Sequence, residues 1–483
     1  MAASEETATS CSYRRAASRH STASIVVAAF AACLLLATAC GSSDSGGEAR
    51  ETRSESADEG LDNSETEVGT TEADDGDDQE PSEQQETGSS IRSEVAAGDK
   101  AADGDAADGD AADEDASEEG EVEDEVEVAG TSTVPVSEEE SIANSIIFPG
   151  AEWETVDPAD AGFDADGLDL IPATADVIGS TCVTVTRNGR LVYEWYADDV
   201  PADGEVEIFS ATKSMASTLV GIAEDEGLLD IDDKASDYIT EWQGTDSEDV
   251  TIRNLLSNDS GRFYDFTTDY VDMATGALDK TAFSVALDQQ HDVGEVWEYN
   301  NSAIQTLEEV LQAAIGDEDV ASWGEEMLLA PIGMENSLWG TDAEGNAMTF
   351  MGVKSNCRDL ARFGTLFLAD GNWDGTQVVP EAWVAEATEP SQELNSRYGF
   401  LWWLNTPVEP DPEQEIEANA GDVNLSWPDV AESTYAAQGL GGQVIEVQPD
   451  TGIVLTRMGS VNNANSGIAL NALNPILMDA FTE

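Results

Sequence analysis

Basic side chains are scarce in this chain of 483 residues, which has 19 Lys or Arg against 101 Asp or Glu and a formal net charge of −82. Proteins that bind nucleic acid or anionic lipid headgroups do so mainly through Lys and Arg. The charge balance therefore argues against either kind of partner. A carboxylate-rich, lysine-poor surface also keeps a protein soluble in concentrated salt, and salt adaptation is a hypothesis that depends on composition alone.

Histidine and cysteine are rare as well, with 2 and 5 residues in the whole chain. No cysteines have the spacing of a metal site, and the sequence predicts neither a metal nor another cofactor. His291 is the only histidine after residue 40, and we expect a polar loop residue there rather than the base of a Ser-His-Asp triad. Cys182 and Cys357 fall in the predicted domain. They could form one disulfide or remain two buried thiols, and the sequence favours neither.

The apolar run at residues 25–39 is too short for a comfortable membrane span, but it suits the core of a signal peptide. Three arginines precede this run, and it ends in Leu-Ala-Thr-Ala-Cys-Gly at residues 36–41. The ending resembles a bacterial lipobox, in which the cysteine is lipidated and becomes the first residue of the mature chain. The sequence predicts a lipoprotein signal peptide at residues 1–40 and a lipid anchor on Cys40. The rest of the chain is then expected at the outer face of the bacterial cytoplasmic membrane.

Residues 41–150 contain almost no aromatic side chains. They carry 36 Asp or Glu against 4 Lys or Arg, a net charge of −32, and include a near-repeat of Ala-Ala-Asp-Gly-Asp at 101–110. Such a segment cannot bury enough apolar surface to fold. We therefore expect an acidic disordered linker between the lipid anchor and a folded domain.

A folded domain is expected at residues 151–483, which carry 63 acidic and 12 basic side chains and a net charge of −51. Strand-like runs at 181–186 and 191–196 flank Asn188-Gly189, the strongest short signal for a hairpin. The domain closes with two more strands and a helix. These are expected at 442–447, 452–458 and 464–481.

The sequence between these strands is mainly helical, and an acidic insertion with several prolines follows at about 405–433. Helical runs are expected at 251–256, 303–314 and 357–368. Strands at both ends of the domain with helices between them predict the α+β class. The expected architecture is an antiparallel sheet built from both chain ends, with an inserted helical lobe.

The stretch 209–215, Phe-Ser-Ala-Thr-Lys-Ser-Met, opens a helical run that continues to Gly227. Ser210 and Lys213 are three residues apart, so a helix brings their side chains to the same face. A serine hydroxyl becomes a good nucleophile when a neighbouring base takes its proton, and a lysine amine can be that base once burial lowers its pKa. At the first helical turn, free backbone N–H groups also favour a developing oxyanion.

The same spacing of Ser and Lys occurs by chance at the solvated start of many helices. This chain has only five lysines, however, and Lys213 alone follows a serine at that spacing. We therefore predict that Ser210 is a nucleophile and that Lys213 is its base.

Two further motifs are weaker when each is read alone. Tyr299 and Asn301 form the only Tyr-x-Asn in the chain. A phenol beside a lysine can relay a proton, but the motif by itself favours a half-buried aromatic residue before a helix that Asn301 or Ser302 caps. Residues 436–443, Ala-Ala-Gln-Gly-Leu-Gly-Gly-Gln, enter a predicted strand. They fit an oxyanion hole and a plain glycine-rich turn equally well.

The order S-x-x-K, Tyr-x-Asn and glycine-rich strand resembles the serine beta-lactamase and penicillin-binding-protein superfamily, in the branch of class C enzymes, esterases and 6-aminohexanoate-dimer hydrolases. Supporting phrases are Leu-Leu-Ser-Asn-Asp-Ser-Gly at 255–261, Pro-Ile-Gly-Met at 331–334 and Tyr-Gly-Phe-Leu-Trp-Trp at 398–403. The resemblance covers about residues 155–483. It implies a beta-lactamase/transpeptidase-like fold.

The resemblance also implies a role for each motif residue. Ser210 would be acylated, Lys213 would be its base, and Tyr299 would be the second base and proton relay. Asn301 would position Lys213 or the substrate. The backbone N–H groups of Ser210 and of Leu440, which follows Gly439, would form the oxyanion hole.

The third motif departs from the pattern of penicillin-binding members, which have Lys-Thr-Gly or His-x-Gly where this chain has Ala437-Gln438-Gly439. The carboxylate of a beta-lactam then has no cation beside the strand, unless Arg397 or Arg457 reaches the site. The leading hypothesis is therefore a cell-surface serine hydrolase of small carboxylic esters or linear amides. The alternatives are a beta-lactamase or D,D-peptidase, and a surface-binding lipoprotein without turnover.

Overall fold

The computed structural model describes residues 146–408 and 425–482. The predicted signal peptide, the lipidation site at Cys40 and nearly all of the acidic linker lie outside the described residues, as do residues 409–424 of the expected insertion. No helix in the described ranges is long and apolar enough to cross a bilayer.

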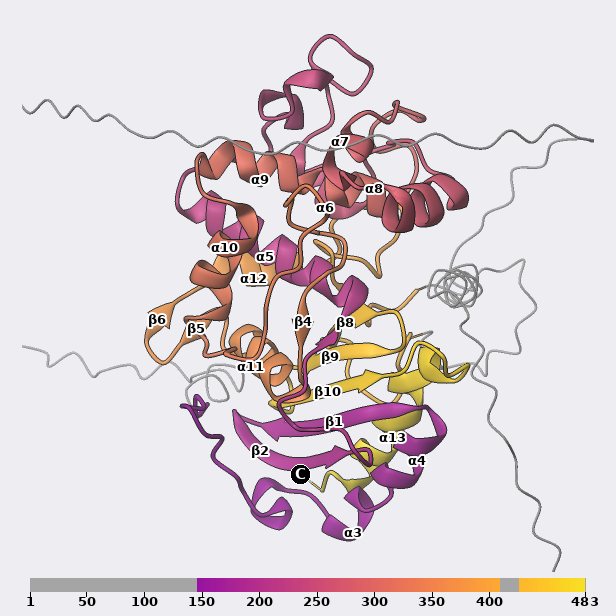
Figure 1. Ribbon diagram of the computed structural model, residues 1–483. Helices are drawn as coiled ribbons and strands as arrows, with labels where there is room; N and C mark the ends of the chain where they lie inside the picture. The colour runs from indigo at the N-terminus through magenta and orange to yellow at the C-terminus, as the bar shows by residue number, and fades with distance from the viewer. Residues whose placement is uncertain (1–145, 409–424, 483) are drawn as a thin grey trace, which may run out of the picture. The chain divides into compact units, whose positions relative to one another are not determined.

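The central sheet of the described residues has six antiparallel strands in the order β2-β1-β10-β9-β8-β7 (Figure 1). Their bounds are β1 (Ser180–Arg187), β2 (Arg190–Tyr196), β7 (Trp403–Leu404), β8 (Tyr435–Gly439), β9 (Gln443–Gln448) and β10 (Ile453–Gly459). β1 pairs with β10 in a register that runs from Cys182 opposite Met458 to Arg187 opposite Ile453. The sheet is thus built from both ends of the domain, and the predicted α+β class is confirmed.

The hairpin between β1 and β2 turns at Asn188 and Gly189, which have φ angles of 46° and 74°. Both angles lie in the left-handed region that a two-residue hairpin turn requires, and Asn-Gly adopts it at little cost. The backbone N–H of Ile147 donates to the Asn188 carbonyl at 2.9 Å. Packing against the domain therefore begins before the expected boundary at residue 151.

Helices cover both faces of the sheet (Figure 1). Successive side chains of a strand point to opposite faces, so Val444 enters one hydrophobic core and its neighbour Ile445 enters the other. The Val444 face packs against the C-terminal helix and two short N-terminal helices, and the Ile445 face packs against a helix from the middle of the chain. The bounds of these helices are α13 (Ala469–Ala480), α3 (Ala165–Leu168), α4 (Ile171–Val177) and α11 (Cys357–Leu368).

The middle of the domain is mainly helical, as expected, and also contains two short ribbons of paired strands. The helices are α5 (Thr212–Asp225), α6 (Ile252–Ser257), η6 (Thr267–Gly276), α7 (Lys280–Val285), α8 (Asn301–Gln305), α9 (Leu307–Ile315), α10 (Val320–Gly324), η7 (Glu325–Leu329) and α12 (Glu381–Ala387). The ribbons pair β3 (Val206–Glu207) with β4 (Lys354–Ser355), and β5 (Asn372–Trp373) with β6 (Thr376–Gln377). Of these helices, η6 and η7 have π-helical geometry, which the sequence did not predict.

Two expected helices differ from the structure in their bounds. The run expected at 303–314 forms two helices, α8 and α9, which meet at Thr306. The C-terminal helix begins at Ala469 rather than at 464. Asn463 and Asn465 lie in the turn before it, where the side-chain oxygen of Asn463 accepts from the Asn465 backbone N–H at 2.8 Å. Short polar side chains that bond to nearby backbone favour turns over helix, which explains the later start.

A disulfide joins Cys182 in β1 to Cys357 at the first position of α11. The two residues are 175 positions apart in the sequence, and both side chains are buried. Of the two possibilities that the sequence left open, the structure contains the disulfide. The bond ties α11 to the strand on which it packs.

Candidate active site

Ser210 lies in a tight turn of 3-10 helix, η3 (Phe209–Ala211), directly before α5. The residue before it, Phe209, has a φ angle of 49°, which is a strained conformation for a bulky side chain. The turn is held from both sides, because the Ile208 N–H donates to the Val353 carbonyl at 2.9 Å and the Ala211 N–H donates to the Ile208 carbonyl at 3.2 Å. Ser210 therefore sits at the positive end of the α5 dipole in a fixed orientation.

Lys213 is one residue into α5, with 1% of its surface exposed. Its Nζ donates to Ser210 Oγ at 2.9 Å, to Asn301 Oδ1 at 2.7 Å and to the Phe350 carbonyl at 2.8 Å. Burial lowers the pKa of Lys213 to about 7, and the negative charge of Asp269 opposes part of that shift. The amine thus contacts the serine, as the spacing predicts, and a substantial fraction of it is neutral near pH 7.

Tyr299 lies next to this amine. The centroid of its ring is 4.8 Å from Lys213 Nζ. The ring stacks on Trp403 with centroids 5.7 Å apart and meets Tyr398 edge-on at 6.2 Å. These two aromatic residues belong to the Tyr-Gly-Phe-Leu-Trp-Trp phrase, so a segment about a hundred residues downstream fixes the orientation of the tyrosine.

Asn301 is the first residue of α8, and Asn300 caps this helix by accepting a hydrogen bond from the Ala303 N–H at 2.9 Å. The expectation that Asn301 or Ser302 is the cap was therefore wrong. The reason is that the helix starts one residue earlier than a cap at Asn301 requires. Asn301 is free of capping and turns its amide oxygen to Lys213.

The end of β8 lies against the turn that carries Ser210. A Cβ atom on Gly439 would be 2.1 Å from the Ile208 carbonyl oxygen and 3.2 Å from the Ala211 backbone nitrogen. Only glycine permits this approach, because any side chain would overlap the backbone. The approach brings the end of β8 against the Ser210 turn, and the family resemblance implies that the next residue, Leu440, is the second oxyanion donor.

Arg457 holds the turn that follows β8. It is fully buried, and its guanidinium donates to the backbone carbonyls of Gly441, Gly442 and Ile178. The sequence left Arg457 as a possible partner for a substrate carboxylate, but its donors are used to hold the turn after β8. Arg397 donates from Nε to the Thr406 carbonyl at 3.3 Å.

His291 lies in the loop before Tyr299, where its Nδ1 is 3.9 Å from Glu295 Oε2 and its side chain is 34% exposed. This agrees with the polar loop residue that the sequence indicates. Across the described residues, no group of three or more His, Cys, Asp or Glu is placed to hold a metal ion.

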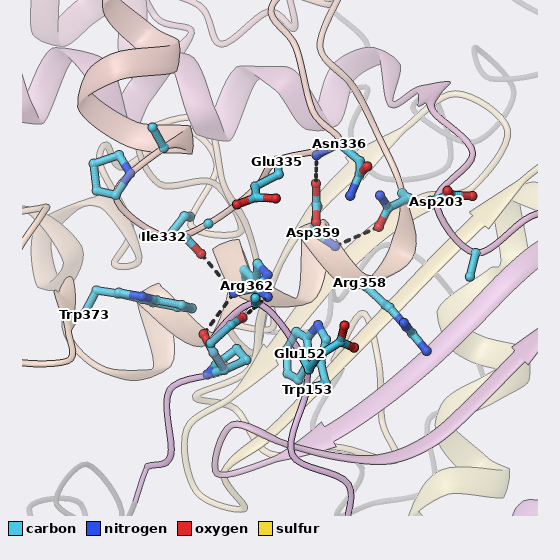
Figure 2. A pocket seen from close by; sticks show the side chains of 18 residues that line it. Glu152, Trp153, Asp203, Ile332, Glu335, Asn336, Arg358, Asp359, Arg362 and Trp373 are labelled. Carbon is cyan, nitrogen blue, oxygen red and sulfur yellow. Dashed lines mark hydrogen bonds between the residues drawn. The ribbon is translucent and has the colours of Figure 1, made fainter.

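A separate cavity of about 620 Å³ lies between residues 149–153 and the N-terminal end of α11, and Ser210, Lys213 and Tyr299 do not line it (Figure 2). Arg362 lines this cavity. Its guanidinium donates to the carbonyls of Pro149, Gly150 and Ile332. These bonds hold the N-terminal segment on the domain. The positive charge of Arg362 at this cavity therefore has a structural role.

Asp269 is a site residue that the sequence did not reveal. It lies in η6, only 1% of its surface is exposed, and it contacts the side chain of Asn301 through a hydrogen bond of 2.7 Å. The chain has 101 acidic residues, and nothing in the sequence around Asp269 separates it from the others. Only the fold shows that this carboxylate is buried beside the site.

The structure combines a sheet closed by both chain ends, a helical part beside it and a serine in contact with a buried lysine, which is the arrangement expected of a serine hydrolase. The comparison with protein families agrees, because the model of the family described as Beta-lactamase matches residues 170–473. The chain belongs to the beta-lactamase family, and it is a hydrolase of that family.

Individual relatives are distant. A 6-aminohexanoate-dimer hydrolase of Paenarthrobacter ureafaciens is 23% identical over 341 residues, which are 65% of this chain and 83% of the relative. A solved Bacillus anthracis structure assigned as a 6-aminohexanoate-dimer hydrolase has a TM-score of 0.53 at 20% identity, covering 70% of this chain and 88% of its own. A structure assigned as a beta-lactamase from Bacteroides dorei DSM 17855 has a TM-score of 0.52 at 19% identity, covering 65% and 99%. The two structures establish the beta-lactamase-like fold.

The contact at Gly439 generates a test. We expect Gly439→Ala to push β8 away from the Ser210 turn, because its Cβ would lie 2.1 Å from a backbone oxygen. Turnover of an ester substrate should fall by at least about tenfold, and unfolding should become easier by about 1–3 kcal/mol. The matched control is Gly150→Ala, since a Cβ there meets no atom within 4 Å. Equal turnover in the two variants would contradict the proposed contact between strand and nucleophile.

Proposed function

We propose that this protein cleaves small neutral carboxylic esters or linear amides through a covalent acyl-enzyme on Ser210. The observation that carries the proposal is the 2.9 Å contact between Ser210 Oγ and the buried Lys213 amine. A relative that is a 6-aminohexanoate-dimer hydrolase supports a linear amide as one substrate class.

The first half-reaction begins when the neutral Lys213 amine takes the hydroxyl proton of Ser210 and Oγ forms a bond to the substrate carbonyl carbon. The negative charge that develops on the carbonyl oxygen is stabilised by the backbone N–H groups of Ser210 and Leu440. The bond to the leaving alcohol or amine then breaks. Tyr299 passes a proton to that group, and Lys213 returns the proton to the tyrosine.

The second half-reaction consumes one water. Lys213 or Tyr299 takes one proton from this water, and the water oxygen attacks the acyl carbon. As the bond to Ser210 Oγ breaks, that proton passes to Oγ and restores the serine hydroxyl. The products are a carboxylic acid and free enzyme. Because burial lowers the pKa of Lys213 to about 7, the amine loses its proton as pH rises through that value, and activity should rise with it.

Beta-lactam hydrolysis is the second candidate, because a structural neighbour is assigned as a beta-lactamase. β8 runs from Tyr435 to Gly439 without a basic residue, and Arg457 is committed to backbone carbonyls. Neither β8 nor Arg457 then offers a cation to the carboxylate of an anionic drug, and the domain around the site has a net charge of −51. Neutral substrates avoid both costs.

We also propose that the enzyme acts at the cell surface, held by a lipid on Cys40. The support is the signal-like run before that cysteine and the acidic linker after it. The disulfide between Cys182 and Cys357 fits an oxidising compartment outside the cytoplasm.

Covalent labelling tests the nucleophile. A fluorophosphonate probe should form an adduct on Ser210 that peptide mapping by mass spectrometry locates. Ser210→Ala should abolish the adduct and lower turnover by about a thousandfold or more, because nucleophile and base act as a unit. An adduct on a different serine, or none in the unmodified protein, would favour the surface-binding lipoprotein without turnover.

Substrate preference separates the two enzymatic candidates. We expect kcat/KM on a neutral short-chain nitrophenyl ester to exceed that on nitrocefin by at least about a hundredfold, or about 2.7 kcal/mol of transition-state stabilisation. Side-by-side steady-state kinetics at one ionic strength provide the measurement. Equal efficiency on nitrocefin would assign the protein to beta-lactam hydrolysis.

In the proposal, membrane localisation depends on the side chain of Cys40. Cys40→Ser should move the protein from the membrane fraction to the soluble exported fraction, because the lipid has no other attachment site at the predicted cleavage position. Immunoblots of the separated fractions give the result. Retention of the variant in the membrane would mean that residues 25–39 are an uncleaved anchor.

A further inference from the structure

Asp269 forms four hydrogen bonds with the first two residues of α8. Its Oδ1 accepts from the backbone N–H and the hydroxyl of Ser302, both at 2.7 Å. Its Oδ2 accepts from the side-chain amide of Asn301 at 2.7 Å and from the Asn301 backbone N–H at 3.3 Å. The carboxylate therefore lies at the N-terminus of this helix, where backbone N–H groups and the helix dipole favour negative charge.

The charge state of Asp269 follows from this geometry. Burial raises the pKa of its carboxyl group above the usual range, and the hydrogen bonds from Ser302 and Asn301 offset part of that rise. Both oxygens accept a backbone N–H, which can only donate, so the ionised form fits the site. A buried carboxylate keeps its charge only when such donors or a nearby cation compensate for the lost water.

The carboxylate decides which way the Asn301 amide points. The oxygen and nitrogen of an amide are nearly equal in size, so hydrogen-bond partners determine their placement. Because Asp269 can only accept, the Asn301 NH₂ group faces it and the amide oxygen faces Lys213 at 2.7 Å. A chain of contacts thus runs from Ser210 through Lys213 and Asn301 to Asp269.

Few other charges act on this chain. The negative charge of Asp269 raises the pKa of Lys213, against the larger effect of burial. Burial raises the pKa of Tyr264, Glu298 and Tyr270, the residue that follows Asp269 in η6, and the charge of Asp269 adds to each rise. The two tyrosines are neutral near pH 7. Lys213 is the cation of this group, and it becomes fully charged at the moment when Ser210 gives up its proton.

We propose that Asp269 is a positioning residue for the reaction at Ser210, which holds the Asn301 amide oxygen toward Lys213 and balances the ammonium that forms when Lys213 takes the serine proton. The proposal rests on the proposed function of the Ser210 site. Asp269 acts through Asn301 and does not contact the substrate. Its loss should therefore change the basicity of Lys213 as well as the rate.

The variant that tests the proposal is Asp269→Asn, which keeps the shape of the side chain and removes its charge. An asparagine has one accepting oxygen for four donors, so its NH₂ group must face another donor and the Asn301 amide is expected to turn over. The matched control is Asp272→Asn, which removes the same charge from an exposed position three residues further along η6.

Two measurements on the mature full-length chain distinguish a positioning role of Asp269 from a role in folding alone. The first is the pH profile of kcat/KM on the neutral ester. The second is a titration of Lys213 by NMR with carbon-13 at the lysine Cε, which the presence of only five lysines in the sequence makes tractable. For Asp269→Asn we expect kcat/KM to fall by at least about tenfold and both midpoints to move to lower pH, because the charge that favours the ammonium is gone. Asp272→Asn should leave rate and midpoints unchanged.

The outcomes are distinct. A lower rate with unchanged Lys213 midpoints, or unchanged kinetics in Asp269→Asn, would overturn the proposal. If Asp269→Asn does not fold, Ser302→Ala removes one donor to the carboxylate and should give a smaller change in the same direction, whereas no change would contradict the proposal. Failure of the proposed function would appear separately, as an unmodified protein without turnover or Ser210 adduct, while the NMR titration would still report whether Asp269 acts on Lys213.

Discussion

The site depends on the burial of one amine, that of Lys213, away from water. Lys213 is 1% exposed, and a buried ammonium is costly unless each of its protons has an acceptor. The three acceptors are Ser210 in η3, Asn301 in α8 and the Phe350 carbonyl. Three segments of the chain must therefore be in place before the amine can be buried, and burial is what lowers the pKa of the amine to about 7.

The sheet supplies the second requirement, which is a fixed strand beside the nucleophile. β8 is held in register by β9, β9 is held by β10, and β10 pairs with β1 from the other end of the domain. Arg457 binds the carbonyls after β8 from behind. Gly439 can then approach the Ser210 turn more closely than any residue with a side chain. The approach of β8 to Ser210, on which the proposed oxyanion hole depends, is thus a property of the whole sheet.

The acidic character of the chain bears on what such a site accepts. The domain has a net charge of −51, and long-range repulsion lowers the local concentration of anionic substrates. The absence of a basic residue along β8 acts in the same direction at short range. Both features favour the neutral esters and amides of the proposed function over anionic penicillins.

The sequence by itself determined the α+β class, the hairpin at Asn188-Gly189 and the pairing of Ser210 with Lys213, because each depends on residues that are close together in the chain. Turn chemistry and helical spacing act locally, so they can be read without the fold. Recognition of the ordered motifs added Tyr299, Asn301 and Gly439. The tertiary structure alone decided the disulfide between Cys182 and Cys357, the division of the run at 303–314 and the capping of α8 by Asn300.

It also decided the place of Asp269, which is one carboxylate among 101 acidic side chains. The function of an acidic residue depends on whether it is buried and on which donors face it, and those neighbours come from segments that are distant in the sequence. In Asp269 the donors belong to α8, more than thirty residues downstream. The local sequence does not predict this contact, because it forms only when η6 and α8 pack against each other.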